Sequence, residues 1–103
     1  MDEFAVKIAR RLKAIEDIAL KLRDEDGDLV LLYVSARVLL DEIQEDVERF
    51  PAPEITGEKL ISMRRHLGTL AGLDHYELPQ GRSEHLVNIL NDSDTVRRNV
   101  LRH

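Results

Sequence analysis

The segment from residue 29 to residue 50, LVLLYVSARVLLDEIQEDVERF, constrains the fold more than any other part of this chain. At about 100° per residue, its apolar side chains form a main stripe along one face of a helix. The members of the main stripe are Leu32, Ala36, Leu39, Leu40, Ile43, Val47 and Phe50. Leu31, Val34 and Val38 form a second stripe on another side. A helix that is apolar on more than one side must be covered on more than one side, so we expect a central helix over residues 29–49.

A regular apolar seam predicts another long helix at the start of the chain, because its members are spaced alternately four and three residues apart. They are Met1, Ala5, Ile8, Leu12, Ile15, Ala19 and Leu22. This helix should end near residues 23–25, and Gly27 can supply the left-handed turn that often follows a helix. Two long helices joined by a short turn favour an antiparallel hairpin. That pairing places Lys7, Arg10 and Arg11 beside the acidic end of the second helix.

The second half of the chain predicts further helices. Thr56 can cap a third helix, with Ile55 packing on Leu60 as a hydrophobic staple, and Gly72 can close it. The apolar face of this helix is formed by Leu60, Met63, Leu67, Leu70 and Ala71. Residues 74–81 are typical of a loop, after which Ser83 can cap a last helical region.

The C-terminal region allows either one helix or two. Residues 91–95, NDSDT, favour a break because their side chains compete for backbone hydrogen bonds. In an unbroken helix, however, one face would carry Leu86, Ile89, Ser93, Val96 and Val100. We therefore predict an all-α, single-domain bundle spanning residues 1–103, with four helices, or five if this region breaks, built on the long antiparallel hairpin.

Composition excludes several classes of function. The chain has no cysteine, so it has no disulfide, thiolate zinc site, iron–sulfur cluster or thiol nucleophile. Its formal net charge is −5 and no segment is strongly basic, which disfavours nucleic acid as a partner. The longest apolar run, residues 29–34, is far shorter than the roughly 20 residues of a membrane span. The start of the chain lacks the pattern of a signal peptide, so we expect a cytoplasmic protein without a membrane partner.

No pattern in the chain predicts a metal, a cofactor or a small-molecule substrate. Residues 24–28, DEDGD, are similar to the start of a calcium-binding EF-hand loop, but Leu29 and Ser35 occupy the positions that need glycine and glutamate. Glu42 and Glu45 give half of the magnesium motif of all-helical nucleotide pyrophosphohydrolases, and no Glu-x-x-Asp follows. The residues of the 74–81 loop show no arrangement of nucleophile and base.

His66 is an alternative candidate, as a phosphoacceptor on the third helix. It flanks the apolar stripe, where its ring could reach solvent, and a helical bundle with one exposed histidine suits phosphotransfer. The motif of histidine phosphotransfer domains, however, has a basic residue three positions later and glycine four positions later, where this chain has Thr69 and Leu70. Arg64 and Arg65 beside His66 also allow a weak helix-turn-helix nucleic-acid binder, although no recognition helix follows.

These patterns favour a small acidic, non-enzymatic module for protein interaction or regulation. The second stripe needs a cover, and any part left exposed would form an interface. The interface candidates are Leu31, Val34, Val38, Asp41, Glu42 and Glu45. The partner can be a second copy of the chain, which would make a homodimer, or another protein. The acidic residues can alternatively serve only to pair with the basic first half of the N-terminal helix.

Overall fold

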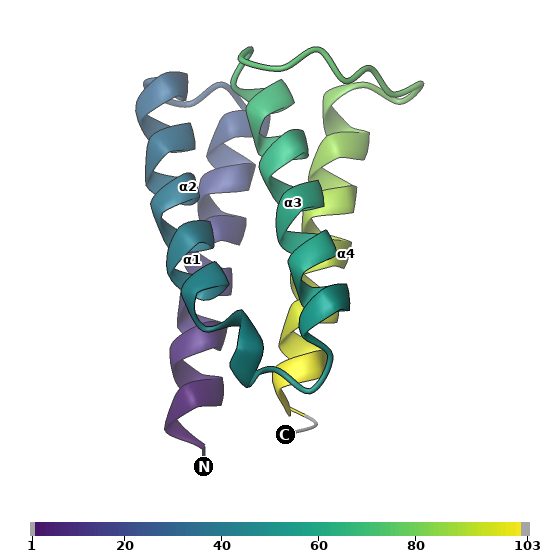
Figure 1. Cartoon of the computed structure of the whole chain (residues 1–103). Coiled ribbons are helices and arrows are strands. Elements are labelled where there is room, and N and C mark those ends of the chain that lie inside the picture. Colours follow the sequence, from purple (N-terminus) through teal and green to yellow (C-terminus); the bar gives the residue numbers. More distant parts are fainter. Residues whose placement is uncertain (1, 102–103) are drawn as a thin grey trace.

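Four α-helices form an up-down-up-down bundle in the computed structural model, which describes residues 2–101 (Figure 1). They are α1 (Glu3–Arg23), α2 (Leu29–Glu45), α3 (Pro53–Leu70) and α4 (Arg82–Leu101), and a short 3-10 helix, η1 (Val47–Arg49), follows α2. The predicted all-α bundle is confirmed, and residues 2–101 contain no strand. Because α4 is unbroken, the bundle has four α-helices within this range rather than five. None of the described helices is both long and apolar enough to cross a membrane.

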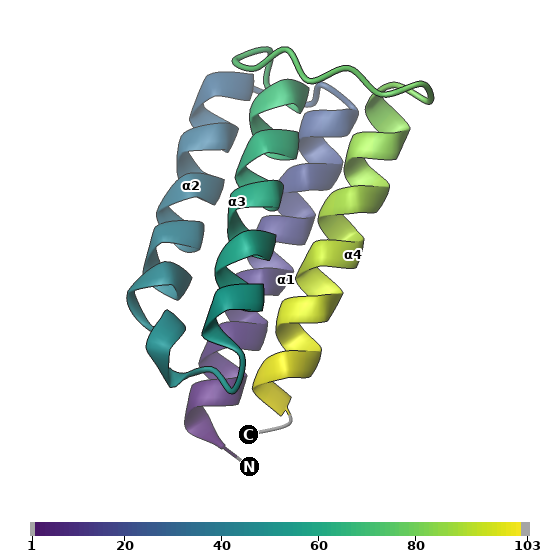
Figure 2. The same ribbon diagram turned by 45° about the vertical axis from the view of Figure 1, so that its right-hand side comes forward.

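Each helix packs beside its neighbours in the chain, and α1 also lies beside α4 (Figures 1 and 2). The α1–α2 turn and the α3–α4 loop lie at one end of the bundle. The α2–α3 connection lies at the other end, close to the start of α1 and the end of α4. Among these neighbouring pairs, α2 and α3 make the least contact.

The apolar seam predicted for the N-terminal helix forms the most deeply buried face in the bundle. The buried residues of α1 are Phe4, Ala5, Ile8, Leu12, Ile15, Ala19 and Leu22. Met1, the first predicted member of the seam, lies outside the described residues. Asp2 caps the helix by accepting a hydrogen bond from the backbone N–H of Phe4. The helix ends at Arg23, and Gly27 has the expected positive φ, +115°.

The prediction that the second helix is central is wrong. α2 buries only Ala36, Leu40 and Ile43, and its side remote from these residues is covered by no other helix of the described chain. The α-helix also ends at Glu45, earlier than predicted, and η1 turns the chain so that Phe50 packs edge-on against Phe4. The inner side of α2 still completes the core, since Ala36, Leu40 and Ile43 belong to the same buried cluster as residues of α1, α3 and α4.

The start of α3 also differs from the prediction. The helix begins at Pro53, whose fixed φ suits the first helical turn, so Thr56 lies inside the helix and does not cap it. Ile55 is 48% exposed and therefore does not form the predicted staple with Leu60. The predicted apolar face is buried, and Gly72 has a positive φ of +78° after the helix, as expected. Ser83 lies within the first turn of α4, which begins at Arg82, so it is not the cap.

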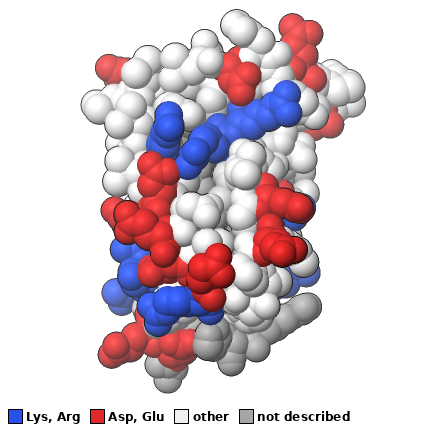
Figure 3. Space-filling model, viewed as in Figure 1, with Lys and Arg blue, Asp and Glu red and all other residues white. Residues whose placement is uncertain are grey.

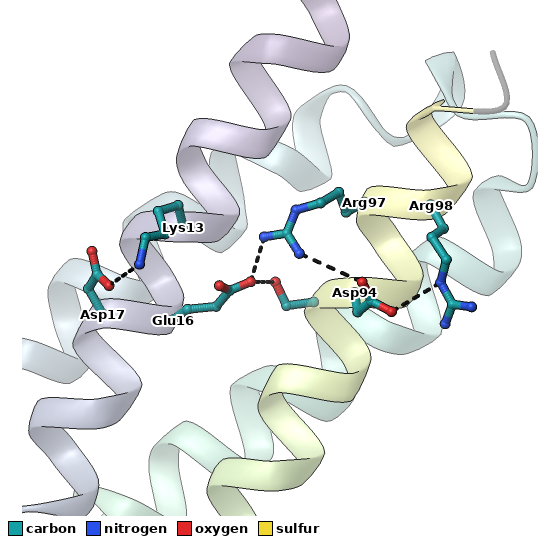
Figure 4. A network of polar contacts seen from close by, with 7 residues as sticks. Lys13, Glu16, Asp17, Asp94, Arg97 and Arg98 are labelled. Atoms are coloured by element: carbon teal, nitrogen blue, oxygen red, sulfur yellow. Dashed lines mark hydrogen bonds and ion pairs between the residues drawn. The ribbon is translucent and has the colours of Figure 1, made fainter.

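Charged side chains align α1 with both of its neighbours. Lys7 contacts Asp46 at 3.0 Å and Arg11 contacts Glu42 at 2.6 Å, so the predicted pairing of the hairpin is confirmed at these two positions, whereas Arg10 is exposed. On the opposite side, Glu16 of α1 accepts hydrogen bonds from Ser93 and Arg97 of α4, each at 2.6 Å (Figure 4). The carboxylate of Glu16 is only 17% exposed, so these bonds lie partly out of water.

Arg82 joins three helices at the end of the bundle that carries the α3–α4 loop. It stands in the first turn of α4 and donates hydrogen bonds to the backbone carbonyls of Leu22 and Arg23, at the end of α1. It also donates to the carbonyl of Leu70, at the end of α3, over 3.0 Å. The last carbonyls of a helix lack partners within the helix and carry partial negative charge, so a guanidinium satisfies both needs.

Candidate functional site

The side of α2 that faces away from the core is apolar and exposed. The exposed fractions are 52% for Val30, 64% for Leu31, 49% for Val34 and 51% for Val38. These four side chains, which we call the outer face of α2, are spaced so that they share one side of the helix. The outer face contains all three residues of the predicted second stripe. Val30 was missed, although it stands one turn before Val34 and could have been found from that spacing.

The three acidic interface candidates lie at the C-terminal end of the outer face, but they are not equivalent. Glu42 is held at 2.6 Å by Arg11 of α1, which makes it part of the hairpin contact. Asp41 contacts Arg64 of α3 at 2.6 Å while its side chain stays 55% exposed. Glu45 is exposed on the same side of α2. Asp41 and Glu45 are therefore the more exposed of the acidic candidates, although the side chain of Glu42 is itself 40% exposed.

A groove between α2 and α3 adjoins the outer face. Its cavity volume is about 250 Å³. The lining residues are Tyr33, Ile61, Arg64, Arg65, Gly68, Leu73 and Asp74. Gly68 brings Tyr33 close to α3, because a Cβ at this position would lie 3.5 Å from Tyr33 Cε1. Ile61 is 66% exposed and Leu73 is 54% exposed, so the groove extends the apolar surface of α2 onto α3.

Charge is distributed unevenly over this side of the molecule. Figure 3 shows α2 and α3 in front, with basic side chains crossing the upper part and acidic side chains gathered lower down on both sides of an uncharged area. A second cavity, lined in part by Glu48, Glu54 and Glu58, lies at the acidic end, and Ile61 borders it as well as the first groove. Acidic residues therefore border the outer face at both ends, with Asp26 and Asp28 before it and Asp41 and Glu45 at its C-terminal end.

His66 does not have the exposed ring that the sequence analysis expected. The residue is 7% exposed, and its Nδ1 lies 2.9 Å from Nδ1 of His85, which is 3% exposed. α4 supplies His85, and Tyr76 of the loop packs edge-on against both rings, with ring centroids 5.6 Å and 6.0 Å away. Arg65 covers Tyr76, with its guanidinium carbon 4.1 Å from the ring centre. The covering segments are distant in sequence, which is why spacing within α3 did not reveal the burial.

Both buried histidines favour the neutral form. Burial lowers the pKa of His66, and the neighbouring charges of His85 and Arg65 lower it further, against the opposing effect of Asp92 and Glu84. Burial also lowers the pKa of His85, and a hydrogen bond with the backbone of Tyr76 opposes this shift. In a neutral pair, the Nδ1–H of one ring donates a hydrogen bond to the unprotonated Nδ1 of the other, which accounts for the 2.9 Å contact.

The polar interface of α3 and α4 continues away from the histidines. Ser62 donates a hydrogen bond to Asp92 over 2.6 Å, and Lys59 lies 3.8 Å from the same carboxylate. Asp92 thus joins Ser62 and Lys59 of α3 to α4, and its side chain is only 11% exposed. Within residues 2–101, no three His, Asp or Glu side chains are grouped as a metal site requires.

Comparison with models of protein families, with curated protein sequences and with solved structures finds no match to this chain. The functional argument therefore depends on the geometry of the outer face, the groove and the histidine pair.

Proposed function

We propose that this domain is a protein-interaction module that binds an α-helix of another protein along the outer face of α2. The observation that carries the proposal is the exposure of four large aliphatic side chains on one side of a helix whose other side lies in the core. Contiguous exposed apolar patches on soluble proteins often mark interfaces. Complete burial of one such side chain is worth about 1.5–3 kcal/mol, so a partner gains affinity by covering them.

The shape of the surface supports a helix as the bound element. The outer face is a straight row along α2, and the groove beside it is bordered by Tyr33, Ile61 and Leu73. An amphipathic helix places its apolar side chains at i, i+3, i+4 and i+7, which match a row and groove of this kind. A helix that contacts α2 and α3 together can also approach the roughly 800 Å² per partner that stable interfaces bury.

Charge supports a partner with basic residues rather than a second copy of this chain. In an antiparallel pair of α2 helices, Asp41 and Glu45 of one copy would face the acidic turn around Asp26 and Asp28 of the other. In a parallel pair, Asp41 and Glu45 would face themselves. Either arrangement brings carboxylates together in a chain whose net charge is already −5. A helix that carries Lys or Arg beyond one end of its apolar row would instead complement the acidic end.

The experiment that tests this proposal begins with a photo-crosslinking amino acid at Leu31 in the native host, and the same residue at Val87 as a control. Val87 is 53% exposed on α4 and lies outside the proposed surface. We expect the Leu31 position to crosslink to a helical segment that contains Lys or Arg. Binding of the purified partner should then fall at least about tenfold in Val34→Asp, since the change removes an apolar contact and places a carboxylate where binding would remove it from water.

The matched variant Val87→Asp makes the same substitution on another helix and should leave binding unchanged. Both variants should keep their unfolding free energy within about 1 kcal/mol of the original chain, because both side chains are exposed. The proposal is wrong if Val34→Asp binds the captured partner normally. It is also wrong if the Leu31 position crosslinks only to another copy of this chain.

A further inference from the structure

Tyr76 packs the middle of the loop between α3 and α4 against the bundle, whereas the start of the loop is bonded to α3, because the N–H groups of Leu73 and Asp74 donate to the carbonyl of Gly68. Tyr76 packs against His66 on α3 and His85 on α4, and Arg65 covers it. Other loop residues, including His75 and Glu77, are exposed. The position of Tyr76 therefore depends on the two histidine rings staying together.

The contact between the rings is compatible with one proton between the two facing nitrogens and not with two. In the neutral pair, one Nδ1–H donates to the other Nδ1 across 2.9 Å. One added proton leaves a donor and an acceptor, although it places a charge in a buried site. A second added proton makes both Nδ1 atoms donors, and two like charges then face each other at hydrogen-bond distance. The rings must then separate.

We infer that the His66–His85 pair is an acid-sensitive latch, which holds the middle of the loop, residues 75–79, against the bundle when neutral and releases it when both rings are protonated. The separation of the rings removes the surface on which Tyr76 packs, because Tyr76 contacts both of them. Leu73 and Asp74, at one end of the groove between α2 and α3, stay bonded to the carbonyl of Gly68, so release frees the segment that follows them. The latch therefore does not depend on the proposed function.

Charged groups from both helices surround the pair. Arg65 on α3 and Arg82 on α4 oppose its protonation, whereas Glu84 and Asp92, both on α4, favour it. Arg82 is occupied by the carbonyls at the ends of α1 and α3 and so stays fixed as the pair titrates. The net effect, dominated by burial, places release below the ordinary histidine pKa of about 6.5.

Limited proteolysis of the isolated chain measures loop release without any partner. A Glu-specific protease can cut after Glu77 in the loop and after Glu25 in the exposed α1–α2 turn, which serves as an internal control. We expect the ratio of cleavage at Glu77 to cleavage at Glu25 to rise several-fold as the pH falls from 7.5 to 5. The variant His66→Gln/His85→Gln should show a ratio independent of pH, and His75→Gln, which changes an exposed loop histidine, should keep the rise.

Nuclear magnetic resonance of the original chain keeps the test decisive even if the double variant does not fold. The imidazole signals of His66 and His85 should titrate together, over the interval in which cleavage at Glu77 rises. The latch is wrong if both rings become protonated while the cleavage ratio stays constant, or if the ratio still rises in a folded double variant. The two proposals can also fail separately. If the latch behaves as expected but the Val34→Asp variant binds its partner normally, only the proposed function is overturned.

Discussion

Replacement of Arg82 by methionine should be the most destabilising change of a partly exposed residue in this chain. The guanidinium donates to the carbonyls of Leu22, Arg23 and Leu70, which end α1 and α3. Methionine has similar length and can still pack along the same surface, so the substitution mainly removes the donors and their charge. The carbonyls of Arg23 and Leu70 are then left to water, which reaches them only in part because Arg82 itself is half-buried, whereas the carbonyl of Leu22 keeps the hydrogen bond from the N–H of Glu25.

The expected loss follows from the number and type of these bonds. A hydrogen bond to a charged group contributes about 1.5–3 kcal/mol. One Nη2 atom serves both Leu22 and Leu70, so the three contacts count as fewer than three independent bonds. Partial hydration of the freed carbonyls lowers the cost further. We therefore expect the unfolding free energy to fall by about 2–4 kcal/mol, a large part of the roughly 5–15 kcal/mol typical of a domain.

Urea unfolding followed by far-ultraviolet circular dichroism measures this loss. An unchanged m-value checks that the variant exposes the same surface area on unfolding as the original chain. Arg82→Lys retains the charge but not the fork of donors, and should lose about half as much. Arg98→Met is the control, because Arg98 is 61% exposed and pairs with Asp94 on the same helix, so the change should stay within about 0.5 kcal/mol. A loss below about 1 kcal/mol in Arg82→Met would refute the assignment of Arg82 as the residue that joins the helix ends.

Four further predictions concern α3 and the histidine pair. Gly57→Ala should raise the unfolding free energy by about 0.5–1 kcal/mol, because a Cβ there meets nothing within 4 Å inside α3, and thermal unfolding would detect the gain. Thr56→Val should stabilise by about 1 kcal/mol in the same assay, since the hydroxyl of Thr56 is buried and finds no hydrogen-bond partner among residues 2–101. Between pH 7.5 and 5.5, the unfolding free energy should fall as the pH falls, because the lowered pKa values of His66 and His85 let the unfolded chain bind more protons than the folded one. Urea unfolding at each pH measures this, and the unfolding free energy of His66→Gln/His85→Gln should change less with pH. A small-molecule phosphodonor should leave His66 unlabelled because the ring is buried, and a label that disappears in His66→Gln would contradict this.

Sequence reasoning succeeded where a property depends on spacing along one helix. The seam of α1 and the main face of α3 repeat with the helical period, so their core residues could be assigned before any packing was known. The pairing of Lys7 and Arg11 with α2 also followed, because a short turn forces adjacent antiparallel helices to meet in register. Helix starts were less predictable. Thr56 is a good capping residue, yet Pro53 begins the helix one turn earlier.

The candidate site was only partly accessible in this way. The spacing identified three apolar side chains that need a cover: Leu31, Val34 and Val38. It did not show that they stay exposed among residues 2–101, because that depends on the position of α2 at the edge of the bundle. The groove could not be predicted because Tyr33, Ile61 and Leu73 come from three different segments. The same reason hid the environment of His66, whose partner His85 stands 19 residues later on another helix.

The sequence by itself determined that this chain forms long amphipathic helices and an antiparallel hairpin, because helical periodicity and short turns act locally. Only the tertiary structure decided which apolar side remains uncovered, that His66 is enclosed with His85 and Tyr76, and that Arg82 joins the ends of α1 and α3. These features depend on which helices become neighbours and how closely they pack. Contacts between residues far apart in the chain leave no mark in the spacing of either segment.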